Sequence, residues 1–157
     1  MAGLAQLPIR LRRCGPADAA AFFALQNEVR AAMPHPEQFV PDTLENITAY
    51  LREDLCIGAY DGERLGAYFI LRYCGRSAHN YAAFLGVPRE EWEHWANADS
   101  AVVHPDWRGN GLQRKLLEAA LPLVRPGIVG SRGHRQPGES IQPEQCPCLR
   151  FCHCRPP

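Results

Sequence analysis

A strand, a glycine-rich turn and an amphipathic helix follow one another without interruption between Ala101 and Leu117. The run before the turn is rich in valine, which is typical of a strand. Gly109 and Gly111 allow the backbone to turn tightly and bring N–H groups close to a ligand. The helix beginning near Leu112 adds the positive end of its dipole to those amides. The segment therefore predicts an anion site, suited to a phosphate or pyrophosphate, where a strand passes into a helix.

The spacing of the glycines distinguishes this turn from two common nucleotide-binding loops. The chain contains no G-x-x-x-x-G-K-[ST] string, which defines the phosphate-binding P-loop. The dinucleotide fingerprint G-x-G-x-x-G fails because Arg114 stands at the third glycine position. The pattern that fits is R-x-x-G-x-[G/A], carried by Arg108 to Gln113, with V-x-P just upstream at Val103-His104-Pro105. Gln113 departs from the pattern, because a small residue is usual at its position.

These motifs resemble the acetyl-CoA site of the GCN5-related N-acetyltransferase family. The resemblance implies that the backbone of three strand residues binds the pantetheine arm and the thioester: Ala101, Val102 and Val103. It also implies that six residues of the turn hold the pyrophosphate: Arg108, Gly109, Asn110, Gly111, Leu112 and Gln113. An ordinary strand, turn and helix without a ligand is the alternative interpretation.

The activity implied by the resemblance is N-acetyl transfer. A neutral amine of a small molecule or protein attacks the thioester of acetyl-CoA directly, and the enzyme contributes positioning and stabilisation of the developing oxyanion. Because an ammonium must first lose its proton, a general base is expected. Asp99, His94 and Glu93 precede or begin the predicted fourth strand, and nothing in the sequence favours one, so the catalytic residues stay unassigned. His104, inside V-x-P, is expected to be an exposed turn residue.

Charge and hydropathy narrow the possible partners. Lysine plus arginine and aspartate plus glutamate both number 17, so no overall field attracts the chain to nucleic acid or an anionic membrane. No apolar run approaches membrane-spanning length, and no hydrophobic signal segment follows the arginines near the N-terminus. We therefore expect a cytoplasmic protein that binds neither nucleic acid nor membrane, while its oligomeric state is left open.

Periodic patterns over the first 124 residues predict an α/β fold, with a mixed sheet flanked by helices. After a short strand at residues 9–12, one helix opens at Gly15-Pro16 and a second at a capping box, Asp42-x-x-Glu45. Their predicted core residues fall at helical spacing: Phe22, Leu25, Val29 and Met33 in the first helix, and Leu44, Ile47 and Leu51 in the second. Two apolar strands at 55–60 and 65–71 flank Asp61-Gly62, which is typical of a hairpin.

A fourth strand is predicted at Ser100 to Val103, followed by a helix over residues 112–124. The apolar stripe of that helix consists of Leu112, Leu116, Ala119, Ala120 and Leu123. The order β-α-α-β-β-β-α is that of the first half of the acetyltransferase fold, so the resemblance covers about residues 8–124. Residues 1–125 are therefore expected to form an incomplete acetyl-CoA-binding domain.

The connection of residues 75–98 contains four aromatic residues, Tyr81, Phe84, Trp92 and Trp95, and a helix predicted to begin at Pro88. Two interpretations are open. The segment is a flap beside the substrate site, or Trp92 and Trp95 simply pack its helix on the sheet.

The composition changes abruptly after Val124. Residues 126–157 hold six prolines, four of the seven cysteines and no periodic apolar pattern. The family requires a fifth strand, splayed from the fourth to open a slot for pantetheine, and a further helix. We expect the tail to be irregular and these elements to be missing or disordered.

Three interpretations of the tail are open. Its cysteines and His153 are ligands that suit zinc, but all of them lie within nine residues with no second pair, so no metal site is predicted. Disulfides are not expected in a cytosolic chain. The third interpretation is translation in the wrong frame: a shift of one base from His134 permits Thr-Val-Ser-Pro-Glu-Asn-Pro-Tyr-Ser, similar to the family's P-x-N-x-x-S segment.

We therefore hypothesise that a base is lost or gained between about codons 124 and 134, which would impair this chain as an acetyltransferase. The alternative function is non-catalytic: a CoA-binding remnant, or an interaction module whose Cys-rich tail binds metal.

Overall fold

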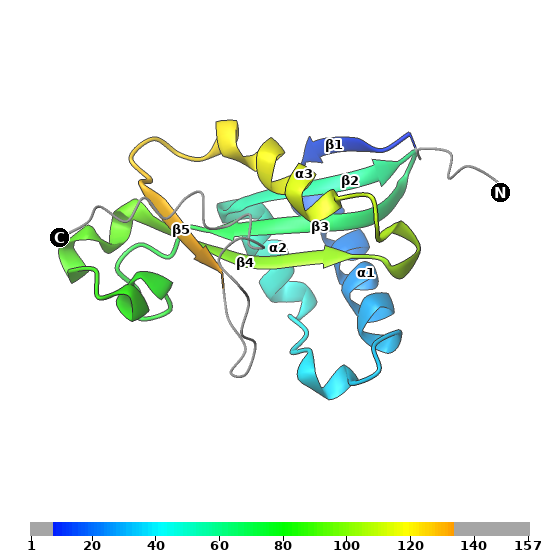
Figure 1. Cartoon of the computed structure of the whole chain (residues 1–157), viewed down its shortest axis with the longest axis horizontal. Coiled ribbons are helices and arrows are strands. Elements are labelled where there is room, and N and C mark those ends of the chain that lie inside the picture. Colours follow the sequence, from blue (N-terminus) through cyan, green and yellow to red (C-terminus); the bar gives the residue numbers. More distant parts are fainter. Residues whose placement is uncertain (1–7, 134–157) are drawn as a thin grey trace.

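A computed structural model describes residues 8–133 of the chain, and Figure 1 shows one sheet with α1 and α2 on one face and α3 on the other. The helices and strands are β1 (Arg10–Arg13), α1 (Ala19–Ala31), α2 (Leu44–Glu53), β2 (Leu55–Asp61), β3 (Arg64–Arg72), β4 (Trp95–Val103), α3 (Leu112–Ala120) and β5 (Gly130–Gly133). Short 3-10 helices lie at Pro16–Asp18, Pro36–Gln38, Tyr81–Leu85, Arg89–His94, Pro105–Trp107 and Leu121–Leu123. The predicted α/β fold class and the order β-α-α-β-β-β-α are confirmed.

The strands lie in the order β1-β2-β3-β4-β5. The first four are antiparallel to their neighbours, and β5 is parallel to β4. The hairpin predicted at Asp61-Gly62 is confirmed: Asp61 pairs with Arg64, and Gly62 has a φ of 58°, which favours glycine. β4 begins at Trp95 rather than at the predicted Ser100, because its first half pairs with strands on both sides despite its polar sequence.

The expectation that residues 126–157 supply no strand is wrong for β5. Its four residues pair in parallel with Trp95–Ala98. A Cβ atom at Gly130 would lie 2.6 Å from the Trp95 ring, so glycine allows the β5 backbone to approach the indole closely. So short a strand has no apolar alternation, which is why the pattern does not reveal it. The tail cysteines and His153, considered as zinc ligands, and the codons after His134 lie outside the described residues, so these interpretations stay untested.

The face of the sheet under α1 and α2 forms the first apolar core. Phe22 of α1 stacks on Tyr68 of β3 with ring centroids 4.4 Å apart. The predicted helix residues Phe22, Leu25, Val29, Ile47 and Leu51 are buried here. Leu44 is an exception, being 46% exposed, because α2 begins at Leu44 itself with Thr43 as its N-cap. Thr43 Oγ1, rather than the predicted Asp42, accepts the hydrogen bond from the Asn46 N–H at 3.1 Å.

The second core lies between α3 and the opposite face of the sheet. Leu112, Leu116 and Ala120 are buried as predicted, and Ala119 is partly buried. Leu123 is 44% exposed, because α3 ends at Ala120 and a 3-10 turn containing Pro122 follows. Among residues 8–133, no helix is long and apolar enough to cross a membrane, and no three His, Cys, Asp or Glu side chains are grouped to hold a metal ion.

Asp18 joins the beginning of α1 to two strands. Its carboxylate accepts hydrogen bonds from Arg12 Nη2 at 2.6 Å, the Gly15 N–H at 3.0 Å and the Tyr60 hydroxyl at 2.8 Å. Burial by itself would raise the pKa of Asp18, but these donors outweigh it and lower the pKa to about 2. Asp18 is therefore a carboxylate that stabilises the fold only while it is ionised.

This low pKa predicts a specific acid sensitivity. Because the folded-state pKa lies below the ordinary value of 3.8, the stability that Asp18 contributes is present at neutral pH and is lost as pH falls from about 4 toward 2. We expect Asp18→Asn to lower the Tm at neutral pH and to weaken the pH dependence of Tm in this range. Asp106→Asn, at a side chain 73% exposed, is the control and should change neither. Equal acid dependence in Asp18→Asn and the parent chain would contradict this account.

Candidate functional site

The described pairing of β4 with β5 ends next to a β-bulge in β4. Within the described residues, β5 pairs only with Trp95–Ala98, whereas β3 pairs with β4 as far as Val103. Ile70 pairs with Ser100 and Leu71 with Ala98, so Asp99 is an extra residue in β4. A bulge bends a strand and increases its twist. No strand of the described chain therefore lies against the outer edge of β4 beyond Asp99.

Two of the three predicted strand residues direct backbone groups toward this open edge. In an antiparallel ladder, successive residues direct their N–H and C=O groups to alternate sides. The His104 N–H donates to the Gly66 carbonyl at 2.8 Å, so Val102 also faces β3. Ala101 and Val103 consequently direct their groups outward, and Ala101 is exposed. The Val102 backbone pairs with β3, and its side chain is buried under α1.

The turn after β4 is held in a tight conformation. His104 Nδ1 accepts a hydrogen bond from the Asp106 N–H at 3.1 Å, and Asn110 Nδ2 donates to the Trp107 carbonyl at 3.0 Å. Gly109 and Gly111 have φ values of 82° and 64°, in the left-handed region that favours glycine. Gly111 is the N-cap of α3 and provides no side-chain cap, so the first N–H groups of the helix stay available to a ligand.

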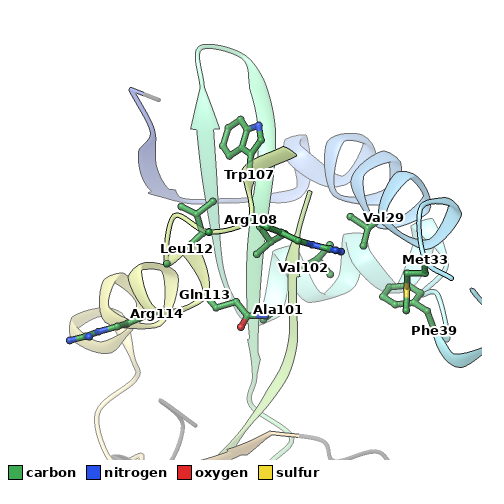
Figure 2. Close-up of a pocket in the computed structure, with 13 residues that line it drawn as sticks. Val29, Met33, Phe39, Ala101, Val102, Trp107, Arg108, Leu112, Gln113 and Arg114 are labelled. Atoms are coloured by element: carbon green, nitrogen blue, oxygen red, sulfur yellow. The ribbon is translucent and has the colours of Figure 1, made fainter. Parts of the chain in front are cut away.

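The open edge, the turn and the beginning of α3 border one cavity of about 600 Å³, shown in Figure 2. This volume is within the range of small-molecule sites. The structure brings eight of the nine predicted residues to the cavity: Ala101, Val102, Val103, Arg108, Gly109, Gly111, Leu112 and Gln113. Asn110 is outside the lining and stabilises the turn instead. The Gln113 side chain extends from α3 toward β4 in Figure 2.

The opposite wall of the cavity was not predicted. It consists of Val29 of α1 and of Met33 and Phe39 in the segment that follows. The sequence predicts Val29 and Met33 as core residues on one face of the first helix. Val29 is buried, but α1 ends at Ala31, so Met33 lies beyond the helix and is only partly buried. The position of Met33 at the end of the predicted apolar face, just before Pro34, is the one sequence signal that its side chain extends beyond the core. We call Val29, Met33 and Phe39 the apolar wall.

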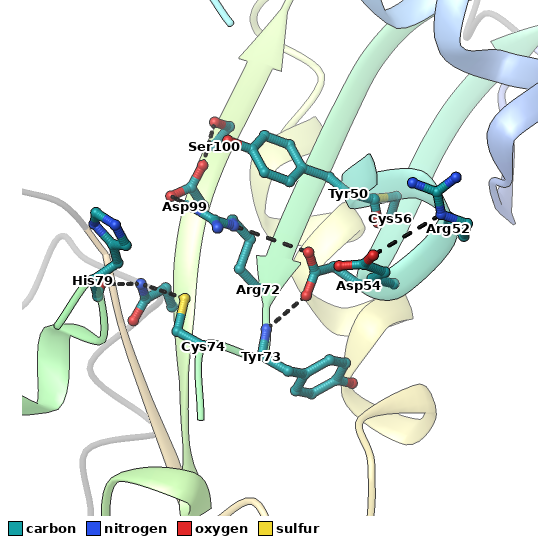
Figure 3. Close-up of polar contacts among 12 residues, drawn as sticks. Tyr50, Arg52, Asp54, Cys56, Arg72, Tyr73, Cys74, His79, Asp99 and Ser100 are labelled. Carbon is teal, nitrogen blue, oxygen red and sulfur yellow. Dashed lines mark hydrogen bonds and ion pairs between the residues drawn. The ribbon is translucent and has the colours of Figure 1, made fainter. Parts of the chain in front are cut away.

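Polar side chains gather at the bulge, on the α2 side of the sheet, as Figure 3 shows. The Asp99 carboxylate accepts hydrogen bonds from the Tyr81 hydroxyl and from Ser100 Oγ, both at 3.3 Å. Arg72 Nη1 lies 3.9 Å from Asp99, and Arg72 Nε lies 3.9 Å from Asp54. The buried Arg72 Nε makes no hydrogen bond within the described part of the chain. Asp99 is therefore held by three side chains at the bulge of β4.

Two tyrosines near this cluster stay protonated at neutral pH. Burial and the nearby Asp42 carboxylate raise the pKa of Tyr50 to about 12, and its hydroxyl donates to Asp42 at 3.1 Å. Burial and Asp99 raise the pKa of Tyr81 to about 12. Both phenols are therefore hydrogen-bond donors beside carboxylates. Burial also raises the pKa of the nearby Asp54, whose carboxylate accepts a hydrogen bond from the Tyr73 N–H at 2.8 Å.

The three candidate bases lie in different environments. Asp99 is at the bulge, with its side chain 14% exposed. Glu93 and His94 belong to the 3-10 helix before β4; Glu93 lies 3.5 Å from Arg76 Nη2, and His94 Nδ1 lies 3.0 Å from the Gly127 carbonyl. Both have side chains about half exposed. His104, expected to be exposed, is only 16% exposed because α1 lies close, with Glu28 at 3.4 Å.

The segment of residues 75–94 lies at the far end of β4 from the glycine turn, near β5 (Figure 1). None of its residues lines the cavity, although Tyr81 contacts Asp99 at the bulge, so the flap interpretation stays a prediction. Pro88 precedes a 3-10 helix rather than an α-helix. Trp92 Nε1 donates to the Val87 carbonyl at 2.8 Å, and Trp95 packs on Gly130. Trp95 is a residue of β4 rather than of a helix, so the packing interpretation, in which both tryptophans pack one helix on the sheet, is not confirmed.

Comparison with known proteins identifies the fold through structure alone. No family model matches the chain, and no curated protein matches its sequence. A ribosomal-protein-alanine N-acetyltransferase from Brucella melitensis biovar Abortus matches with a TM-score of 0.53 and 17% identity, over 82% of this chain and 83% of that one. An aminoglycoside N-acetyltransferase in complex with CoA matches with a TM-score of 0.57 and 11% identity, over 82% and 78%.

A diaminobutyrate acetyltransferase from Paenibacillus lautus, in complex with L-2,4-diaminobutyric acid and coenzyme A, matches with a TM-score of 0.53 and 10% identity. The match covers 78% of this chain and 60% of that enzyme. The described chain is thus an α/β protein with the architecture of the acetyltransferases. More particularly, it has a partial fold of the GCN5-related N-acetyltransferase type, and the resemblance seen in the motifs is confirmed at the level of fold.

Proposed function

We propose that this chain binds acetyl-CoA and transfers its acetyl group to an amine of a small molecule or a protein. The observation that carries the proposal is the continuity of one cavity, in which the open edge of β4 leads directly to two left-handed glycines and the N-terminus of α3. An unpaired strand edge can bind an extended amide-bearing arm as a further strand would. The helix N-terminus suits a pyrophosphate, and Arg108 of the turn lines the same cavity. Solved structures of this fold include complexes with CoA, which supports the proposal.

The proposed chemistry depends on positioning by the β4 edge. An outward N–H group, at Ala101 or Val103, would donate to the oxyanion that develops on the thioester carbonyl. Asp99 would accept the proton that the acceptor ammonium must lose before attack, and Tyr81 and Arg72 would orient its carboxylate. The amine nitrogen then bonds to the acetyl carbon, the C–S bond breaks, and the proton that this nitrogen loses protonates the departing CoA thiolate. We further propose that the protein works in the cytoplasm.

A second candidate function is CoA binding without catalysis. The Cys- and Pro-rich composition after residue 134 favours it, because under the frame-shift hypothesis the remaining elements of the acetyltransferase fold are not encoded in this frame. Acetyl transfer to a panel of amines, by this chain and by its frame-corrected version, separates the two functions. Activity in the corrected chain alone would favour the remnant.

Binding is tested by thermal melts with and without acetyl-CoA. A ligand that binds only the folded state raises the Tm, corresponding to about 2.7 kcal/mol at a concentration of 100 times Kd. We expect Gly111→Ala to cost about 1–2 kcal/mol through its left-handed backbone and to reduce this ligand-induced shift. Gly62→Ala is a matched control: Gly62 has a similar φ of 58° in the distant β2–β3 turn and open space around it, so its ligand-induced shift should equal that of the parent. Absence of any shift in the parent chain would overturn the proposed function.

A further inference from the structure

The cavity has two chemically different sides. Its charged residues, Arg108 and Arg114, both belong to the turn and α3. Across the β4 edge, the apolar wall of Val29, Met33 and Phe39 contributes no charged or hydrogen-bonding side chain. The figure of the cavity places Met33 and Phe39 on the far side of β4 from Arg114 (Figure 2). Arg108 extends from the turn toward Val29 in Figure 2, so a cation lies beside one edge of the apolar wall. A ligand that fills the cavity therefore meets positive charge at the turn and an apolar surface at Met33 and Phe39.

The reacting end of the proposed ligand faces the apolar wall. If the turn holds the pyrophosphate, the arm of the ligand follows the edge from Val103 through Ala101 toward the bulge at Asp99. On that path the residue between Val103 and Ala101 is Val102, which packs in the same core as Val29. The Asp99 carboxylate lies on this same side of the sheet, with Arg72 and Tyr50. The thioester and the group attached to it would therefore emerge beside α1.

The apolar wall is held in place before any ligand binds. Gln26 of α1 is 1% exposed, and its side-chain amide holds the backbone of Asp42 through two hydrogen bonds, from Nε2 to the carbonyl at 2.6 Å and from the Asp42 N–H to Oε1 at 3.1 Å. Arg30 Nε donates to the Pro36 carbonyl at 3.3 Å. These contacts fix both ends of the segment that carries Phe39 against α1. A preformed wall avoids the entropic cost of ordering a loop on binding.

We propose that the apolar wall receives the acyl group of the donor, and that the preferred donor is an acyl-CoA with an apolar chain longer than acetyl. The inference rests on the proposed function, since it takes the turn as the pyrophosphate site. An acetyl group has one methyl to bury, whereas a butyryl or hexanoyl chain extends over Met33 and Phe39. Met33 suits this role, because its unbranched thioether side chain adapts to chains of different length.

The test is the affinity of the full chain for CoA, acetyl-CoA, butyryl-CoA and hexanoyl-CoA, measured by calorimetry. We expect binding to tighten up to about fourfold for each added methylene, equivalent to about 0.8 kcal/mol per buried CH₂. Met33→Gln keeps the length of the side chain and makes the wall polar, so it should reduce the chain-length dependence while leaving the affinity for CoA itself unchanged. Val40→Gln is the matched control, because Val40 is a neighbouring apolar residue that is 88% exposed and lines no part of the cavity.

The outcomes separate this inference from the proposed function. If CoA and all three thioesters bind with equal affinity, the apolar wall does not receive the acyl chain, and CoA binding still stands. If affinity rises with chain length equally in the parent, Met33→Gln and Val40→Gln, another surface receives the chain and the inference is wrong. If none of the four compounds binds, the proposed function itself fails.

Discussion

Replacing Asp99 by asparagine is expected to lower acetyl transfer by about 10²- to 10⁴-fold, the usual contribution of a general base. Asparagine has almost the same shape; its oxygen can still accept from Tyr81 and its amide can donate to Ser100 Oγ, but it cannot take up a proton. Asp99→Asn should therefore bind acetyl-CoA as the parent does. The measurement is the rate of transfer to amine acceptors across neutral and alkaline pH, together with the ligand-induced Tm shift. A general base should leave a residual rate in the variant that rises with pH, as the fraction of free amine increases.

Glu93→Gln is the control for this experiment. Glu93 is the same kind of acid and was an equal candidate by sequence, but its carboxylate is half exposed and lies 3.5 Å from Arg76 rather than at the open edge. Its substitution should change the rate by less than about twofold, as expected for a surface residue. If Glu93→Gln, rather than Asp99→Asn, removes activity, the assignment of the base is wrong. If Asp99→Asn keeps full activity, the amine loses its proton to another group or to water.

Gly66→Ala is expected to destabilise the fold by about 1–3 kcal/mol, the usual cost of overpacking a core, and to weaken acetyl-CoA binding as well. A Cβ atom at Gly66 would lie 2.1 Å from the ring of Trp107, which is 2% exposed. The indole would have to move, and Trp107 lies in the turn just before Arg108 and Gly109. The close approach of Trp107 to β3 thus sets the position of the proposed pyrophosphate site.

Denaturant unfolding and the ligand-induced Tm shift measure the two effects of Gly66→Ala separately. Gly15→Ala is the control, because Gly15 has an ordinary φ of −131° and no atom within 4 Å of an added Cβ. Unchanged stability in Gly66→Ala would mean that the indole relocates freely. Lost stability with an unchanged ligand-induced shift would mean that the turn and Trp107 are not coupled.

The elements with strong local patterns were predictable from sequence. Phe22, Leu25 and Val29 mark α1, and Asp61-Gly62 marks the hairpin, because helical spacing and turn chemistry are properties of neighbouring residues. The sequence does not predict β5, because its four residues have no apolar alternation and form a strand through their pairing with Trp95–Ala98. The first half of β4 is not predicted for the same reason, since it is a strand through its pairing with β3 and β5 rather than through its own pattern.

One part of the candidate site is likewise predictable from sequence, and another part is not. The turn from Arg108 to Gln113 is continuous in sequence, so its spacing could be compared with known motifs. The apolar wall joins α1 to β4, and the environment of Asp99 joins residues from α2, β3 and the segment after it, so only the fold brings them together. This is why Asp99 could not be distinguished from Glu93 and His94 by sequence.

The bulge at Asp99 also determines which side of the sheet each part of β4 serves. Ala96 and Ala98 pack toward α3, whereas Val102, also an even-numbered residue, packs toward α1. In a regular strand, residues separated by an even number share one face, so the extra residue reverses the alternation. Deleting Asp99 would turn either Ala96 and Ala98 or Ser100 and Val102 to the wrong layer. In evolutionary terms, the fold can tolerate replacement of this residue but not its loss, and sequence gaps in β4 should be absent from any functional descendant of this chain.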